Sequence, residues 1–140
     1  ENLESELEIA FCRIQNDLFD IGAILASSSE QRERYSIASI AESQIELLES
    51  EIDRFQEALV PLREFILPAG NRPSALTHLA RSVCRRAERA IVDFAKHKPS
   101  DVPTTLTCYM NRLSDWLFVV ARYINHQDGQ AESFWQKQSH

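Results

Sequence analysis

The sequence has 140 residues, 15 Lys and Arg against 21 Asp and Glu, and a formal net charge of −6. Its 3 glycines and 5 prolines are too few for the many tight turns of an all-β sandwich or barrel. The acidic balance argues against nonspecific nucleic-acid binding, and no apolar run reaches the ~18 residues that a membrane span needs. Long helices joined by a few loops therefore remain.

The first predicted helix covers residues 2–26. Its apolar residues recur at steps of three and four, the period of one helix face. They are Leu3, Leu7, Ala10, Phe11, Ile14, Leu18, Ile21 and Leu25. Polar residues on this helix, including Asp17 and Asp20, are expected to face solvent. Three serines and several charged residues then predict a loop up to residue 35.

The second predicted helix begins near Ser36 and ends or kinks at Pro61, which cannot continue a helix. Its apolar residues keep the same period and include Ile37 and Ile40. The next segment, FILPAGNRP at residues 65–73, places three large apolar residues directly before a loop rich in Pro and Gly. Apolar residues on such a loop indicate either a plug for the core or a ligand contact.

The third predicted helix starts at residue 73 or 74 and runs to about residue 96, and the fourth covers residues 104–125. The inward face expected for the third is Leu76, Leu79, Ala80, Val83, Ala87, Ala90 and Phe94. The inward face expected for the fourth is Met110, Leu113, Leu117, Val120, Ala121 and Ile124. A short tail with Phe134 and Trp135 follows. Four long amphipathic segments predict an all-α fold, a four- to five-helix bundle.

The third helix carries the sequence RSVCRRAER at residues 81–89, in which four arginines and one glutamate give a net charge of +3. At 100° per residue, Arg81, Arg85 and Glu88 form one narrow stripe opposite the expected apolar face. Arginines four residues apart repel each other, and the guanidinium group suits phosphate. The stripe therefore favours an anion site, and a solvated face or a subunit salt bridge is the alternative.

The fourth helix has a second polar stripe that contains Asn111, Asp115 and Arg122, with the large aromatic Phe118 among them. A ligand or a partner subunit that covers that face would explain the aromatic equally well. Because each of these helices has a second face with contact residues besides its apolar face, we expect an oligomer. Cys12, Cys84 and Cys108 are widely spaced, and no His or Cys pattern predicts a disulfide framework, a metal site or a nucleophile–base pair.

Four blocks of the sequence resemble the PduO-type ATP:cob(I)alamin adenosyltransferases, in the order and approximate spacing of that family. The blocks are RIQNDLFDIGA at residues 13–23, FILPAG at 65–70, HLARSVCRRAER at 78–89 and NRLSDWLF at 111–118. The resemblance implies a ferritin-like helical bundle that assembles as a homotrimer with active sites at the subunit interfaces. It implies transfer of the 5′-deoxyadenosyl group of ATP, accompanied by Mg²⁺, to the cobalt of reduced cobalamin, giving adenosylcobalamin and triphosphate.

By resemblance, ATP is bound by Arg85, Arg86, Glu88, Arg89 and Asn111, while Arg81 and Arg85 have catalytic roles. Phe65 resembles the aromatic that occupies the lower face of the corrin and excludes an axial ligand, and Phe118 is the second expected cobalamin contact. No metal-binding residue is assigned. Cobalt(I) is itself a strong nucleophile, so the protein needs only to position the substrates and stabilise the triphosphate.

The resemblance also sets expectations about the chain and its partners. The family has a phosphate-binding loop before the first helix, so we expect residues 1–140 to be a single bundle domain that lacks this segment. The expected location is the cytoplasm, or the mitochondrial matrix in a eukaryote, and an adenosylcobalamin-dependent mutase or dehydratase is a possible partner. The alternative function is a non-catalytic trimeric helical module that carries or escorts cobalamin.

Overall fold

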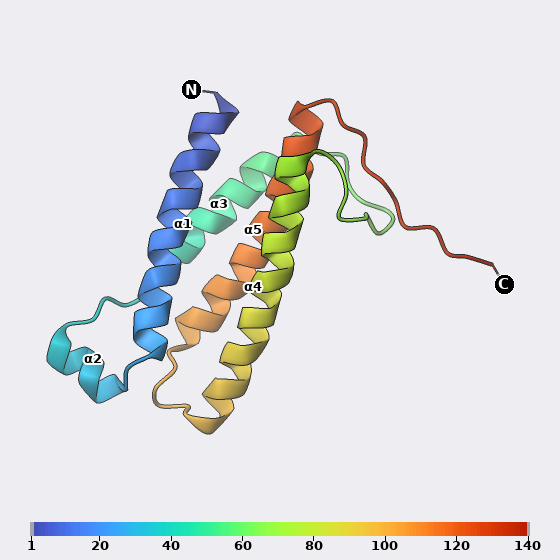
Figure 1. Ribbon diagram of the computed structural model, residues 1–140. Helices are drawn as coiled ribbons and strands as arrows, with labels where there is room; N and C mark the ends of the chain where they lie inside the picture. The colour runs from blue at the N-terminus through green and yellow to red at the C-terminus, as the bar shows by residue number, and fades with distance from the viewer. Residues whose placement is uncertain (1, 140) are drawn as a thin grey trace.

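The computed structural model describes residues 2–139, and these form five helices with no named strand. The helices are α1 (Leu3–Leu25), α2 (Ser29–Tyr35), α3 (Glu42–Gln56), α4 (Arg72–His97) and α5 (Thr104–Gln127). The four long ones form an elongated bundle, α2 lies at one end, and the tail leaves from the other (Figure 1). The expected all-α bundle is confirmed. No helix in the described part of the chain is both long and apolar enough to cross a bilayer.

Helix α5 is the centre of the bundle. Twelve of its 24 residues are buried, which is the pattern of a helix enclosed on most sides. It packs against α3 on one side and α4 on the other. Long side chains connect it to α1, where the Phe11 ring meets Trp116 edge-on with 5.3 Å between the ring centroids. Helix α4 therefore packs along the central helix of the bundle.

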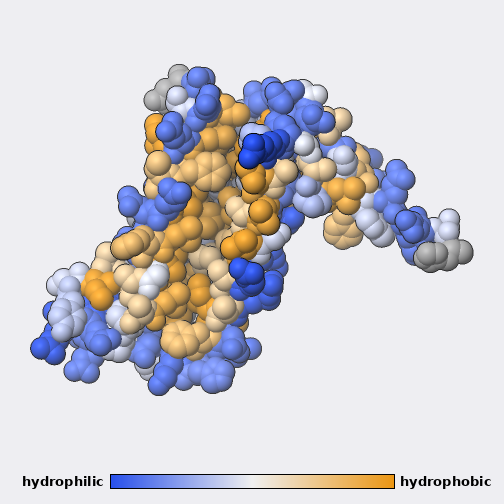
Figure 2. Space-filling view, viewed as in Figure 1, coloured by the Kyte–Doolittle hydropathy of each residue, from blue (hydrophilic) through white to orange (hydrophobic). Residues whose placement is uncertain are grey.

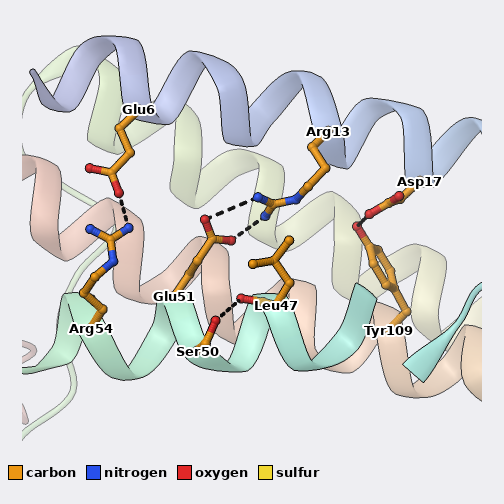
Figure 3. Close-up of polar contacts among 8 residues, drawn as sticks. All are labelled: Glu6, Arg13, Asp17, Leu47, Ser50, Glu51, Arg54 and Tyr109. Atoms are coloured by element: carbon orange, nitrogen blue, oxygen red, sulfur yellow. Dashed lines mark hydrogen bonds and ion pairs between the residues drawn. The ribbon is translucent and has the colours of Figure 1, made fainter. Parts of the chain in front are cut away.

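Polar contacts join α1 to α3 and α5 (Figure 3). Arg13 pairs with Glu51 and Arg54 pairs with Glu6. Asp17 is buried, contrary to the expectation of solvent exposure, and its carboxylate accepts a hydrogen bond of 2.7 Å from the Tyr109 hydroxyl. Asp17 follows the buried Ala10 and Ile14 on the same helix face, so its spacing already placed it inside.

The segment between α1 and α3 differs from the prediction. Residues 27–35 were expected to be a loop, but they contain α2, because Ser28 and Gln31 form a reciprocal capping box. The predicted second helix was too long at its start. Ser36 adopts a left-handed conformation with φ of 51°, and α3 begins only at Glu42. Ile40 is nevertheless buried, so its side chain contributes to the core although it lies in the loop before α3.

Helix α4 is rotated relative to the prediction. The expected inward residues Leu76, Leu79 and Val83 are 53%, 60% and 47% exposed. Figure 2 shows a band of hydrophobic surface in the region between α1 and α4. A groove of about 840 Å³ lies in this region, with Phe11 from α1 and Ala80 from α4 among its lining residues. Within this chain, the apolar face of α4 is thus largely uncovered.

Candidate active site

The polar stripe of α4 continues through His78, Thr77 and Ser74 toward the start of the helix, and this part of it faces α5. The Ser74 hydroxyl donates to the Ala121 carbonyl at 2.8 Å, and the Cys84 thiol donates to the Met110 carbonyl at 3.4 Å. Thr77 is also buried there, and its hydroxyl donates to a carbonyl of its own helix. Short side chains that bond to backbone carbonyls can be buried at little cost, which explains why the polar face of α4 can pack inward. The stripe does not lie on the outer face as predicted.

Phe118 packs against this stripe from α5. The Arg81 guanidinium carbon lies 5.1 Å from the centroid of the Phe118 ring, and the His78 ring meets the same ring edge-on at 6.2 Å. A cation over an aromatic face is attracted to its quadrupole, so Phe118 supports Arg81. The aromatic on the polar stripe of α5 therefore has a partner within the same chain.

Burial and charge shift the pKa values of two residues in this cluster. Burial, together with the positive charge of Arg85, lowers the pKa of Arg81. Burial is also the main cause of the lowered pKa of His78, and the charge of Arg81 adds to it. His78 is therefore neutral near pH 7, while an arginine stays charged even after a downward shift. The cluster presents fixed positive charge next to a neutral ring.

Several side-chain polar atoms of the stripe are buried without a hydrogen-bond partner. Among residues 2–139, three of the four buried side-chain nitrogen or oxygen atoms without a hydrogen-bond partner are His78 Nδ1, Arg81 Nε and Glu88 Oε2. The fourth is on Trp116 of α5. Buried polar groups are nearly always paired, so several exceptions on one helix face indicate a place where other groups bind.

Arg85 of the stripe and two arginines of α4 outside it, Arg86 and Arg89, are available to an anion. Arg85, Arg86 and Arg89 are exposed, and within residues 2–139 none of them has a carboxylate within 4.0 Å. Asn111 of α5 donates a hydrogen bond of 3.2 Å to Oε1 of Glu88, which lies between them in the sequence. The structure therefore brings Asn111 together with Glu88, one of the four predicted ATP-binding residues on α4.

The two residues predicted to contact the corrin, Phe65 and Phe118, differ in their exposure and surroundings. Phe65 lies on the loop between α3 and α4 and is 78% exposed, whereas Phe118 is half-buried between α4 and α5. The ring neighbour of Phe65 is Trp135 of the tail, with 6.3 Å between their centroids. Phe65 is thus open to a large apolar ligand, and the structure gives it no contact with Phe118.

Sequence reasoning missed one residue near this loop. Arg122 was placed on the outer polar stripe of α5, but it is 5% exposed and pairs with Glu132 of the tail. Arg122 also donates a hydrogen bond of 2.7 Å to the carbonyl of Val60, at the start of the connection that carries Phe65. The sequence of α5 carried no signal for this burial, because both partners of Arg122 lie in other parts of the chain.

Comparison with known proteins agrees with this geometry. The sequence model of the family described as cobalamin adenosyltransferase matches residues 1–124. A cobalamin adenosyltransferase from Cupriavidus metallidurans is 38% identical over 138 residues, which are 98% of this chain and 70% of that protein. The corrinoid adenosyltransferase of Bacillus subtilis is 37% identical over 129 residues, which are 92% of this chain but only 62% of that protein.

Solved structures show the same fold. A variant of the PduO-type ATP:corrinoid adenosyltransferase from Lactobacillus reuteri, complexed with cobalamin and ATP, superimposes with a TM-score of 0.86. The two sequences are 31% identical, and the match covers 97% of this chain and 72% of the other. A second variant of that enzyme, complexed with ATP, has a TM-score of 0.80 and 32% identity, with 96% and 71% of the two chains covered. The family model over residues 1–124 and the relatives that share its fold therefore place this chain in the cobalamin adenosyltransferase family.

Proposed function

We propose that this protein transfers the 5′-deoxyadenosyl group of ATP to the cobalt of reduced cobalamin, releasing triphosphate and forming adenosylcobalamin. The observation that carries the proposal is on α4. Within residues 2–139 the exposed Arg85, Arg86 and Arg89 have no carboxylate within 4.0 Å, and the same helix carries buried polar atoms without a hydrogen-bond partner. Family membership and the cobalamin and ATP complexes of the Lactobacillus reuteri enzyme support it.

The proposed chemistry needs no protein nucleophile. The cobalt(I) electron pair forms a bond to C5′ of ATP, and the C5′–O bond breaks with its electron pair going to the triphosphate. The leaving group gains negative charge, and Arg85, Arg86 and Arg89 can stabilise that charge with charge-assisted hydrogen bonds. Glu88 and Asn111, which are joined by a hydrogen bond, are proposed to hold the nucleoside part.

Arg81 and the aromatics have supporting roles in this proposal. Arg81 is held over Phe118 and is proposed to act beside Arg85 at the reacting end of ATP. Phe65 and Phe118 are proposed to contact the corrin, with Phe65 at its lower face, where an apolar ring excludes water from the cobalt. Excluding water and fixing the distance between cobalt and C5′ are then the main contributions of the protein.

The proposed assembly is a homotrimer with a site at each subunit interface. The exposed side chains of Leu76, Leu79 and Val83 on α4 support it, and Leu76 also lines the groove between α1 and α4. Contiguous exposed apolar surface of this kind is typical of protein–protein contacts. A neighbouring subunit on this face would lie close to the α4 arginines and could complete the site.

The test is an assay of adenosylcobalamin formation from ATP and chemically reduced cobalamin. Arg85→Ala should lower kcat by about 10²–10³-fold, the usual effect of removing a donor that stabilises transition-state charge. The matched control is Arg54→Ala, which removes an arginine of α3 that pairs with Glu6 of α1, and it should leave the rate within twofold. Corrinoid binding without turnover by the unmodified protein would instead favour a carrier, and wild-type kcat in Arg85→Ala would reject the site.

A further inference from the structure

We propose that Arg122 is a positioning residue that sets the placement of Phe65 against the corrin, an inference that rests on the proposed function. Arg122 projects from α5, and its side chain is 6% exposed. A buried guanidinium is costly unless its hydrogens are paired. Here Nε donates to Glu132 Oε1 at 2.5 Å and Nη2 donates to the Val60 carbonyl at 2.7 Å.

These two bonds join three parts of the chain. Val60 lies at the start of the connection from α3 to α4, which carries Phe65, and Glu132 lies on the tail after α5. The tail and the connection also contact each other. The amide of Leu67 donates to the Ser133 carbonyl at 2.7 Å, and the amide of Trp135 donates to the Phe65 carbonyl at 2.8 Å. Glu132 directly precedes this pairing, so its bond to Arg122 fixes which tail residues meet Phe65.

The other end of the connection is held by the same helix. Asn125, one turn after Arg122, accepts a hydrogen bond from the Asn71 amide and donates one to the Ala69 carbonyl, both at 3.1 Å. Gly70 between them has φ of +127°, and an added Cβ there would overlap the Asn125 amide. The last turns of α5 therefore bind the connection near both of its ends, at Val60 and at residues 69–71, and Phe65 lies between these two points.

The contacts of Phe65 itself are too few to fix its position. It is 78% exposed, its ring neighbour Trp135 is 50% exposed, and the pairing of Ile66 with Phe134 is an isolated bridge. A short pair of strands without a packed hydrophobic face is marginal in water. The Arg122 attachment is consequently the element that holds this part of the connection and the tail together on the bundle.

Placement of the aromatic matters for the proposed reaction. A ring at the lower face of the corrin excludes axial water only if it stays in contact with the macrocycle, and displacements of about 1 Å can cost about 10²-fold in rate. Arg122 does not need to touch the corrin for this role. Loss of its two bonds would free the Val60 end and the tail, and the Phe65 ring would lose its fixed position.

The experiment compares Arg122→Met, Phe65→Ala and the combined variant. The rate of adenosylcobalamin formation is measured as a function of cob(I)alamin and of ATP, and the electron paramagnetic resonance spectrum of cob(II)alamin is recorded with ATP present. We expect Arg122→Met to lower kcat/KM for cobalamin at least tenfold, with KM for ATP within twofold. Its spectrum should show the signal of cob(II)alamin with an axial water, as that of Phe65→Ala should. The combined variant should have the same kcat/KM and the same spectrum as Phe65→Ala alone.

Two further variants keep the test decisive. Glu132→Gln retains an acceptor but removes the charge, and it should give a smaller effect of the same kind, about threefold, even if Arg122→Met does not fold. Arg54→Met removes an arginine that pairs with Glu6 between α3 and α1, and it should change neither the spectrum nor kcat/KM. Thermal unfolding followed by circular dichroism verifies that each variant is folded.

The outcomes separate this inference from the proposed function. If the unmodified protein forms no adenosylcobalamin, the proposed function fails, while the spectrum of bound cob(II)alamin still reports on Arg122. If the unmodified protein is active and the Arg122→Met and Glu132→Gln spectra match it, the positioning role is wrong. Rate effects of Arg122→Met and Phe65→Ala that multiply in the combined variant would equally overturn it, because the two residues would then act independently.

Discussion

Replacement of Gly70 by alanine tests how the connection between α3 and α4 is held. Gly70 has φ of +127°, a region that residues with a Cβ rarely adopt, and forcing alanine into it costs about 1–2 kcal/mol. The new Cβ would also overlap the Asn125 side chain and displace it. That displacement breaks the hydrogen bonds to Asn71 and Ala69, at about 1 kcal/mol each. The free energy of unfolding should therefore fall by about 3–4 kcal/mol.

The magnitude is measured by urea unfolding against a matched control. Gly22 lies in α1 with open space around its Cβ position, so Gly22→Ala should raise the free energy of unfolding by about 0.5–1 kcal/mol. In an Asn125→Ala background the overlap and the two hydrogen bonds are already gone, and Gly70→Ala should then cost only the backbone term of about 1–2 kcal/mol. An equal cost in both backgrounds would refute the reasoning, as would a Gly70→Ala variant within 0.5 kcal/mol of the unmodified protein.

Three other predictions concern stability, reactivity and assembly. Burial and the hydrogen bond to Asp17 raise the pKa of Tyr109, so the unfolded chain loses the Tyr109 proton at lower pH than the folded chain does. The midpoint of urea unfolding should therefore fall as the pH rises above ~10, and it should fall less steeply in Tyr109→Phe. Burial raises the pKa of the Cys84 thiol to about 11, so at pH 8 a disulfide reagent should label exposed Cys108 at least tenfold faster, and equal rates would contradict the burial. Leu79→Glu places a charge on the exposed apolar face of α4, and light scattering should show loss of the proposed trimer; an unchanged mass would exclude this face from the interface.

The helices that could be predicted are those with a strong apolar period and clear end signals. Asn71 caps α4, and Pro73 follows within its first turn, so the start of that helix is evident in the sequence. The capping box that starts α2 was hidden in a run of serines, which also favour loops. The late start of α3 could not be predicted, because Ile40 keeps the helical period although it is buried from a loop.

The candidate site was found as a set of residues but not in its orientation. Periodicity identified the two faces of α4 correctly, but it could not tell which face packs within the chain. The rule that apolar residues point inward fails where a helix contributes to two interfaces, since each face then has its own partner. Phe118 was unusual in the sequence as a large aromatic on a polar stripe, and in the structure the Arg81 guanidinium lies over its ring. Arg122 could not be found from its own helix, since its partners lie on the distant Val60 and Glu132.

The pairing of the tail with the connection has a consequence for the order of folding. Helices α4 and α5 are joined by residues 98–103 and can meet early, because contacts that are near in sequence close small loops. The bond from Leu67 to Ser133 instead joins residues on opposite sides of that hairpin, and it can form only after both helices are in place. We expect residues 65–67 and 133–135 to be the last to gain protection from hydrogen exchange during refolding, so the bundle matures before its most exposed aromatic loop is in position.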